Sequence, residues 1–224
     1  MMENVIVLKC GGSTLSKLSD RFFKNIQALR RSGFKPIIVH GGGPEIKAML
    51  ETLSIESEFV NGLRKTTKEV LDVVEMVLTG AVNNELTRRL NQTKIKSIGL
   101  SGSDANLLMA EPKDFEKLGF VGEIIDVNVP LLKAFIEQDI VPVIAPIAIG
   151  RDGERYNVNA DTVAGAVAKA ISAKQLIFVT DVPGILKDGE LLEMVSETDI
   201  KELIAQGDIY GGMIPKVEAA LHSL

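Results

Sequence analysis

Short apolar runs that end in glycine turns recur along the chain and predict its architecture. The first run, Val5–Leu8, continues into Lys9-Cys10-Gly11-Gly12, and the second, Pro36–Val39, continues into His40 and three glycines. Such unbroken runs, rich in β-branched residues, are typical of strands buried on both faces of a parallel sheet. Ligands bind beyond the carboxyl ends of these strands, so we expect a binding site at the two glycine turns.

Apolar residues at helical spacing separate these runs and predict helices between them. Strand and helix therefore alternate with short connections, which predicts an α/β fold, a three-layer αβα sandwich with a mostly parallel central sheet. Helices are predicted over residues 20–32, 44–53, 68–90, 130–138, 162–172 and 197–205 and from about 215, and further strands over 35–39, 95–100, 121–127, 140–144 and 176–179.

Turn and capping signals mark the ends of several elements. Asn61-Gly62 predicts a loop or hairpin over residues 55–65, and Lys187-Asp188-Gly189 predicts a second hairpin. Thr66-Thr67-Lys68-Glu69 fits a capping box at the start of the long helix, and Asn128 fits an N-cap. Residues 107–120 follow neither period and stay unassigned.

The length of 224 residues allows one large domain or two lobes, and two lobes is our working interpretation. The net charge of −5 supplies no broad basic field, so nucleic acid is not an expected partner. The most apolar stretch, Ile140–Ile149, contains two prolines and is about half the roughly 20 residues of a membrane helix, so we interpret it as a buried strand with a bend. With no signal-peptide pattern at the N-terminus, we expect a cytoplasmic protein outside the membrane.

Cysteine and histidine are too scarce for several kinds of catalytic site. Cys10 is the only cysteine, which excludes an intramolecular disulfide and fits a reducing compartment. Lys9 beside it could lower the pKa of the thiol, but its place in a buried strand favours a packing role. His40 and His222 are the only histidines, so a histidine-rich metal site is excluded and no Ser/His/Asp system can be assembled. His40 is expected to hydrogen-bond within its glycine turn.

The two glycine turns are candidate phosphate sites, because glycine lets backbone N–H groups approach an anion and the following helix adds its positive end. The alternative is that each is an ordinary tight turn. Neither is a P-loop, and a dinucleotide fingerprint fails because Ile46 stands where glycine or alanine is required.

Four charged residues lie near glycines or helix starts. Lys9 follows four buried apolar residues and therefore needs surroundings that accept its charge. Lys216 taken alone is most simply a solvated surface lysine. Asp161 taken alone is a residue that caps a helix or faces its dipole, and Asp181 is a turn aspartate.

Five motifs, which occur in the order typical of the family, give the chain a resemblance to the amino-acid kinase family. The similarity runs from Val5 to the end. The motifs of Lys9 and Lys216 mark the whole family, whereas those of Arg64 and Asn157 narrow the resemblance to members that act on N-acetyl-L-glutamate. The five are Leu8-Lys9-Cys10-Gly11-Gly12, Val39-His40-Gly41-Gly42-Gly43-Pro44, Asn61-Gly62-Leu63-Arg64-Lys65-Thr66, Asn157-Val158-Asn159-Ala160-Asp161 and Gly211-Gly212-Met213-Ile214-Pro215-Lys216.

The resemblance implies ATP-dependent phosphorylation of the side-chain carboxylate of N-acetyl-L-glutamate in arginine biosynthesis, with Mg²⁺ held mainly by the nucleotide phosphates and no protein ligand named. A carboxylate is ionised at neutral pH, so this chemistry needs no general base and agrees with the shortage of histidine. Lys9 and Lys216 would contact the transferred phosphoryl group, and Asp161 would position both lysines. The other implied roles are phosphate contacts by the backbone of Gly11 and Gly12, substrate binding by Gly42, Gly43, Arg64 and Asn157, and nucleotide binding by Thr180, Asp181, Gly184, Ile209 and Tyr210.

The resemblance also implies a single domain over 1–224, with an acylamino-acid lobe over about 1–172 and a nucleotide lobe over about 173–224. Arginine-inhibited members carry a helix before the first strand, which here begins at Val5, so we expect a homodimer without arginine inhibition through that site. Members continue past the helix of Lys216, so an end at Leu224 leaves open whether the nucleotide lobe is complete. A kinase for an N-blocked aminoadipate and a non-catalytic nucleotide-binding sensor stay as alternatives.

Overall fold

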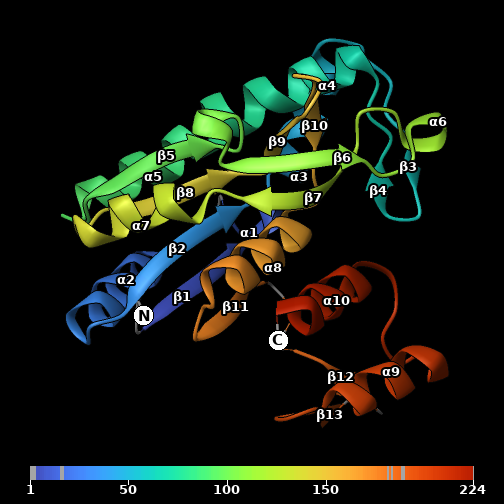
Figure 1. Ribbon diagram of the computed structural model, residues 1–224. Helices are drawn as coiled ribbons and strands as arrows, with labels where there is room; N and C mark the ends of the chain where they lie inside the picture. The colour runs from blue at the N-terminus through green and yellow to red at the C-terminus, as the bar shows by residue number, and fades with distance from the viewer. Residues whose placement is uncertain (1–3, 16–17, 181, 183, 188–189, 224) are drawn as a thin grey trace.

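A five-stranded parallel sheet forms the centre of the fold, as the apolar runs predict. The computed structural model describes residues 4–15, 18–180, 182, 184–187 and 190–223, with the backbone alone for 222 and 223. The strand order is β11-β1-β2-β8-β5, so β1 and β2 are neighbours and their glycine turns leave the same edge of the sheet (Figure 1). The strands are β1 (Val5–Cys10), β2 (Lys35–His40), β5 (Ser97–Ser101), β8 (Val141–Ala145) and β11 (Gln175–Val179).

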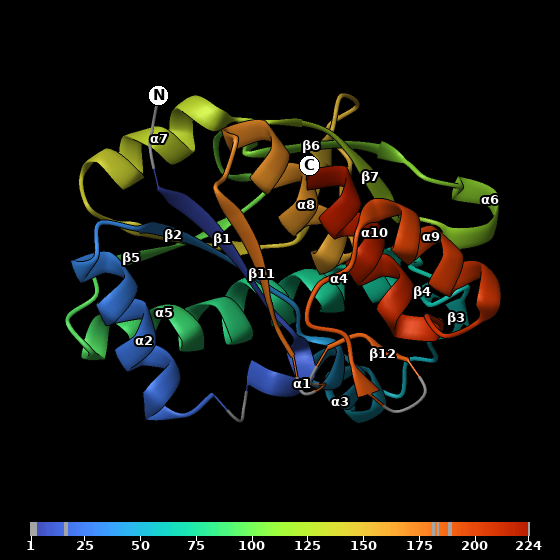
Figure 2. The same cartoon turned by 90° about the horizontal axis from the view of Figure 1, so that it is seen from below.

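Helices cover both faces of this sheet, which confirms the predicted α/β layers (Figure 2). Side chains of β1 alternate between two cores: Ile6 and Leu8 enter one, and Val5 and Val7 enter the other. One apolar strand therefore belongs to two hydrophobic layers. The first face carries α1 (Gly12–Leu15), α2 (Asp20–Arg31), α3 (Gly43–Thr52), α4 (Lys68–Glu75) and α5 (Asn83–Gln92), and the second carries α7 (Val129–Glu137) and α8 (Ala160–Ile171).

A second sheet of four strands, in the order β10-β9-β6-β7, was not predicted. The stretch 140–149 is not one bent strand: β8 lies in the central sheet and β9 in the second, with Pro146 between them. Proline has no N–H to donate to a ladder, so it suits a point where pairing changes. The unassigned residues 107–120 contribute β6 and a short helix. The elements are β6 (Leu108–Pro112), α6 (Phe115–Leu118), β7 (Gly122–Val127), β9 (Ile147–Gly150) and β10 (Arg155–Asn157), preceded by a 3₁₀ turn over Asp104–Asn106.

The long helix predicted over 68–90 extends from α4 through α5, with an unpredicted π-helical segment at Met76–Val82 between them. The predicted capping box is wrong by one residue, because the N-cap is Thr67, whose hydroxyl accepts from the N–H of Val70 at 3.2 Å. The π segment presses against the second glycine turn. A Cβ on Gly42 would lie 2.7 Å from Cδ2 of Leu78, so a larger residue there would displace the Leu78 side chain.

The remaining elements are two hairpins, one near residue 60 and one near residue 188, and two C-terminal helices. The predicted hairpin at Asn61-Gly62 is confirmed, with both residues at positive φ (+50° and +79°). The second predicted hairpin is confirmed by its antiparallel strands, although its turn residues Asp188 and Gly189 lie outside the described residues. The elements are β3 (Phe59–Val60), β4 (Leu63–Arg64), β12 (Leu186–Lys187), β13 (Glu190–Leu191), α9 (Glu197–Gln206), a 3₁₀ turn (Gly211–Met213) and α10 (Ile214–Ser223).

The C-terminal segment has a small core of its own around Ile200, Leu203 and Val217. It joins the rest of the molecule where α10 packs closely on α8: a Cβ on Gly165 would lie 2.8 Å from the carbonyl oxygen of Ala219. This close packing brings the start of α10 to the start of α8. In the described part of the chain, no helix is long and apolar enough to cross a membrane.

Candidate active site

Lys9, Asp161 and Lys216 come together from three elements distant in sequence. Lys9 lies in β1, Asp161 in the first turn of α8 and Lys216 in the first turn of α10. The Lys9 Nζ lies 3.0 Å from Oδ1 of Asp161, and the Lys216 Nζ lies 3.5 Å from Oδ2 of the same carboxylate. Asp161 does not cap its helix, since the side chain of Asn159 accepts from the N–H groups of Asp161 and Thr162. The carboxylate is therefore available to bridge two lysines.

This cluster carries one more positive than negative charge in a largely buried place. Lys9 is 7% exposed and Asp161 6% exposed, and the Lys216 side chain is more open, at 23%. Lys216 also donates to the carbonyl oxygen of Gly212 at 3.1 Å. Electrostatic interactions are stronger where water is excluded, so the unbalanced charge favours an anion beside the lysines.

The two glycine turns interlock next to these lysines. A Cβ on Gly12 would lie 2.7 Å from the backbone nitrogen of Gly43 and 2.9 Å from that of Gly42, which no side chain could accommodate. The N–H groups of Gly12 and Gly43 begin α1 and α3, where helix geometry leaves them without an intrahelical acceptor. The N–H of Gly11 is different, because it donates to the carbonyl oxygen of Val179 at 3.1 Å. Gly11 thus lines the site without a free donor.

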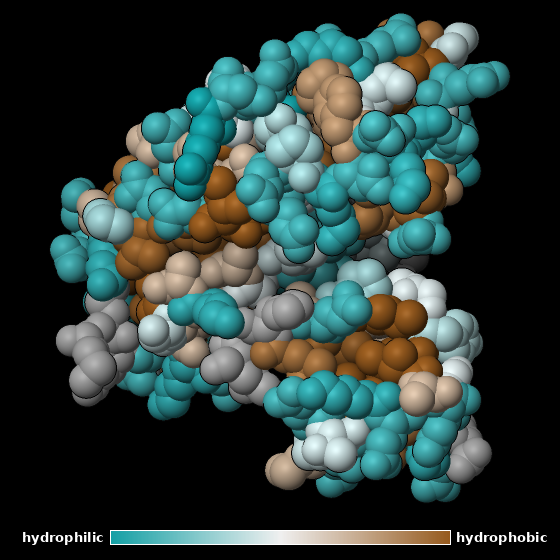
Figure 3. All heavy atoms as spheres, turned by 45° about the vertical axis from the view of Figure 1, so that its right-hand side comes forward, coloured by the Kyte–Doolittle hydropathy of each residue, from teal (hydrophilic) through white to brown (hydrophobic). Residues whose placement is uncertain are grey.

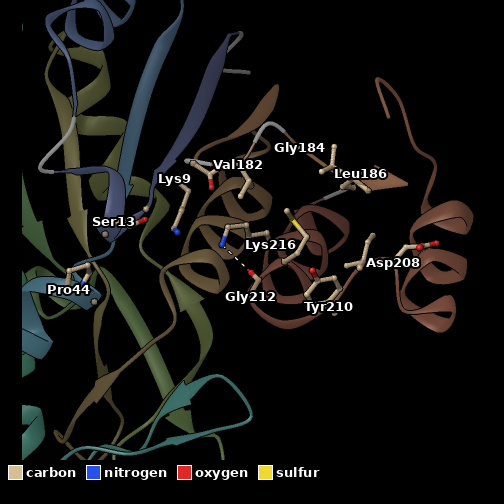
Figure 4. A pocket seen from close by; sticks show the side chains of 17 residues that line it. Lys9, Ser13, Pro44, Val182, Gly184, Leu186, Asp208, Tyr210, Gly212 and Lys216 are labelled. Carbon is tan, nitrogen blue, oxygen red and sulfur yellow. Dashed lines mark hydrogen bonds between the residues drawn. The ribbon is translucent and has the colours of Figure 1, made fainter. Parts of the chain in front are cut away.

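A pocket of about 670 Å³ opens in front of the lysines (Figure 4). Figure 4 shows Lys9 and Lys216 reaching toward each other, with Ser13 and Pro44 on one side and Tyr210 on the other. The described residues predicted to bind nucleotide all line it: Thr180, Gly184, Ile209 and Tyr210. Asp181 lies outside the described residues. Five further residues of the C-terminal segment line the pocket and were not predicted as site residues: Val182, Ile185, Leu186, Asp208 and Met213.

A smaller cavity of about 180 Å³ holds the residues predicted to bind the acyl amino acid, Gly42, Gly43, Arg64 and Asn157. Gly43 lines both cavities, so they meet at the second glycine turn. The Arg64 guanidinium donates to Oγ of Ser57 at 2.5 Å and stacks 4.7 Å above the ring centroid of Phe59. Burial lowers the pKa of Arg64, but a guanidinium keeps its charge in proteins. The cavity thus offers a fixed cation beside an amide.

Arg64 and Asn157 are joined by a residue that sequence reasoning misplaced. The Thr66 hydroxyl donates to the carbonyl oxygen of Arg64 at 2.8 Å and accepts from Nδ2 of Asn157 at 3.1 Å. Thr66 is fully buried, which a capping role does not require. The burial of Thr66 is what indicates its role, and burial of a polar residue cannot be predicted from the sequence pattern.

His40 and Cys10 are structural, as predicted. Nδ1 of His40 lies 2.9 Å from the carbonyl oxygen of Gly41 within the glycine turn, and Nε2 lies 3.0 Å from Nδ2 of the buried Asn83. Burial lowers the pKa of His40 to about 4, so the ring is neutral at pH 7. Burial also raises the pKa of Cys10 to about 12, so the alternative of an activated thiol is wrong. No group of three His, Cys, Asp or Glu residues that could hold a metal occurs among the described residues.

A hollow separates the main body from the C-terminal segment, and apolar side chains are exposed on the C-terminal side of it (Figure 3). Asn61 and Lys117 line it on the side of the body, and Pro215 lines it on the other side. Asp161 and Lys216 also line this hollow. The charged cluster is therefore reached from the hollow as well as from the larger pocket.

Known proteins resemble this chain along its whole length. The model of the amino acid kinase family matches residues 4–224. Acetylglutamate kinases from Geobacillus thermodenitrificans and Halalkalibacterium halodurans are 53% and 55% identical over 223 residues, which span 100% of this chain and 86% of each relative. The crystal structure of smu.665 from Streptococcus mutans has a TM-score of 0.93 at 32% identity over 98% of this chain and 89% of that one.

A more distant structure shows the fold alone. Carbamate kinase from Giardia lamblia bound to AMP-PNP has a TM-score of 0.71 at 15% identity, over 100% of this chain and 90% of that one. The family match, the close relatives and the architecture agree with the five motifs. The chain belongs to the amino acid kinase family.

Proposed function

We propose that the chain transfers the γ-phosphoryl group of ATP to the side-chain carboxylate of N-acetyl-L-glutamate, a step of arginine biosynthesis. The observation that carries the proposal is the Lys9–Asp161–Lys216 cluster, placed beside a large pocket and close to a smaller one lined by Arg64 and Asn157. Relatives named acetylglutamate kinase, at 53% and 55% identity over the whole chain, support the same substrate.

The reaction exchanges one phosphorus–oxygen bond for another. A carboxylate oxygen attacks the γ-phosphorus, the bond to the bridging oxygen breaks, and ADP and an acyl phosphate form. The carboxylate is already ionised, so no residue has to remove a proton. The obstacle is repulsion between anions, which Lys9 and Lys216 offset while Asp161 keeps the two ammonium groups in place. The N–H groups of Gly12 and Gly43, at the starts of α1 and α3, add donors for phosphate oxygens.

The large pocket fits a nucleotide in its chemistry. Apolar residues such as Ile185 and Met213 suit a base, and lysines and glycine N–H groups suit phosphates. Asp208 is the only acidic side chain among the described residues that line it, so Mg²⁺ would be held mainly by phosphate oxygens and would there neutralise their charge. Thr180, Asp181, Gly184, Ile209 and Tyr210 are the proposed nucleotide residues, with the backbone of Gly11 and Gly12 beside the phosphates.

Arg64, Asn157, Gly42 and Gly43 are the proposed contacts of the acyl amino acid. Arg64 keeps its charge although it is half-buried beside the cavity. It is therefore suited to bind the carboxylate of the substrate that does not react. We assign this substrate to a lobe over about 1–172 and the nucleotide to a lobe over about 173–224. The separate core of Ile200, Leu203 and Val217 supports the second lobe.

Assembly and location complete the proposal. We propose a homodimer, supported by the exposed apolar side chains of Met49 on α3, Leu53 at its C-cap and Met76 on the neighbouring π segment. We propose a cytoplasmic location, since the relatives are bacterial enzymes and the only cysteine is buried and free.

The test is an acyl-phosphate trap. The protein is incubated with ATP, Mg²⁺ and hydroxylamine and with N-acetyl-L-glutamate, N-acetyl-2-aminoadipate or free glutamate, and hydroxamate is measured. We expect the highest kcat/KM with N-acetyl-L-glutamate. Product from the aminoadipate but none from N-acetyl-L-glutamate would assign the chain to the longer substrate instead.

A further inference from the structure

Thr66 occupies the meeting point of three segments that are far apart in sequence. It directly follows the β3–β4 hairpin, and its hydroxyl contacts Asn157 at the end of β10. Its backbone N–H donates to Leu118 and its carbonyl oxygen accepts from Phe120, each at 2.8 Å. The backbone of Thr66 is therefore held by the end of α6 and by the residues just after it, and the hairpin that carries Arg64 ends at a fixed point.

The hydroxyl of Thr66 determines the orientation of the Asn157 amide. A hydroxyl has a single proton to donate, and here that proton goes to the carbonyl oxygen of Arg64, which can only accept. Oγ1 must therefore act as an acceptor toward Asn157. Only Nδ2 of the amide can donate, so the oxygen of Asn157 cannot occupy that position.

This orientation bears on the cavity, because Asn157 and Arg64 both line it. The bond to Thr66 uses one of the two Nδ2 hydrogens. Among the hydrogen bonds of the described residues, none involves Oδ1 of Asn157. The amide thus keeps one donor and one acceptor for a molecule in the cavity, in an order set by Thr66.

We propose that Thr66 is a positioning residue for the acyl amino acid, holding the Arg64 backbone and the Asn157 amide in one joint arrangement. The inference rests on the proposed function, since the cavity is taken to bind N-acetyl-L-glutamate. Thr66 lines neither cavity and acts through its two neighbours. Its effect falls on the acyl amino acid and not on the nucleotide.

Thr66→Val tests the proposal, because it keeps the shape and removes the hydroxyl. We expect the KM for N-acetyl-L-glutamate to rise about tenfold, the scale of one lost hydrogen bond, with the KM for ATP unchanged. Thr66→Ser should restore the wild-type value. In a double-mutant cycle with Asn157→Ala, the two effects should be strongly non-additive. If Thr66→Val does not fold, Thr66→Ala takes its place.

Thr67→Val is the matched control. Thr67 is the next residue in the sequence, and the substitution removes its N-cap hydrogen bond from the N–H of Val70. It should lower the melting temperature without changing the KM for N-acetyl-L-glutamate. If the wild type is active, an unchanged KM for N-acetyl-L-glutamate in Thr66→Val, or additive effects in the double-mutant cycle, would overturn this inference. The proposed function would then still stand. A wild type inactive toward N-acetyl-L-glutamate would overturn the proposed function and, with it, this inference.

Discussion

The ammonium group of Lys9 lies 3.0 Å from the carboxylate of Asp161, and each side chain is 8% exposed. A charged pair so deeply buried is weak evidence for stability, because the desolvation of both groups offsets their attraction. The position of this ion pair beside the open pocket indicates a role in binding or catalysis instead. Asp161 also contacts Lys216, so one carboxylate fixes the distance between two cations that face the pocket.

Lys9→Met removes the buried cation and keeps the length of the side chain. If Lys9 stabilises the transferred phosphoryl group, kcat should fall by about 10²-fold or more, the effect of losing one preorganised transition-state contact. Asp161 keeps Lys216 as a partner, so we expect the protein to fold. Hydroxamate formation at saturating substrates measures kcat, and circular dichroism checks the fold.

Lys47→Met is the control for that substitution. Lys47 lies on the surface with its side chain 72% exposed and pairs with Glu51 on the same helix. Such exposed pairs contribute little to stability, and no change in kcat is expected. Near-normal turnover in a folded Lys9→Met variant would exclude Lys9 from the mechanism.

Gly12→Ala tests the interlocked glycine turns. The added methyl group would meet backbone nitrogens of Gly42 and Gly43 at 2.9 and 2.7 Å, and backbone atoms cannot turn aside as a flexible side chain can. We expect the turns to separate, stability to fall by about 1–3 kcal/mol and the KM for ATP to rise. Urea unfolding and steady-state kinetics measure the two effects.

Gly43→Ala is the steric comparison, because a Cβ there meets no atom within 4 Å. Its unfolding midpoint should stay close to that of the wild type. Equal stability losses in the two variants would show that the turns do not depend on the contact at Gly12.

Parts of the site could be predicted from the sequence where the local structure of a motif is determined by the residues of that motif. The strand before Lys9, the glycine turns and the Asn61-Gly62 hairpin depend on neighbours in sequence, and all three are confirmed. The approach of Lys216 to Lys9 is different, because it depends on the packing of α10 on α8. Periodicity does not encode that packing, so the pairing came from the resemblance alone.

Contacts between distant segments decide the features that were missed. Thr66 fits the capping box with Glu69, but the N-cap is Thr67. The backbone of Thr66 pairs instead with Leu118 and Phe120, which are distant in sequence. The π segment also follows helical spacing in sequence. Periodicity therefore does not distinguish it from an α-helix, and its Leu78 lies against the glycine turn at Gly42, which is distant in sequence.

Arg64→Ala separates substrate binding from nucleotide binding. The guanidinium lies in the smaller cavity and not in the larger one, so its loss should raise the KM for N-acetyl-L-glutamate by about tenfold or more and leave the KM for ATP nearly constant. Arg88→Ala, which removes an exposed arginine paired with Glu85, is the control and should change neither. A variant of Arg64 altered only in its affinity for ATP would contradict the assignment.

His40 should make the stability of the protein fall as the pH is lowered through the range below 6.5. Burial lowers its pKa from the ordinary 6.5 to about 4 in the folded protein, so between these values the unfolded chain binds a proton that the folded chain does not. The contribution of a neutral His40 is complete above pH 6.5 and is lost as the pH falls toward 4. At pH 5 the loss amounts to about 2 kcal/mol relative to pH 7.5.

Urea unfolding of the wild type and of His40→Gln at pH 7.5 and pH 5 measures this difference. Most carboxylates stay ionised at pH 5, so the histidine accounts for most of the change. His222→Gln, which removes the other histidine of the chain, should keep the wild-type dependence, whereas His40→Gln should flatten it. The Hε1 resonance of His40 provides a second measurement in the folded protein and should move only below about pH 5. A resonance that titrates near pH 6.5 would show that the ring is not held neutral between Gly41 and Asn83.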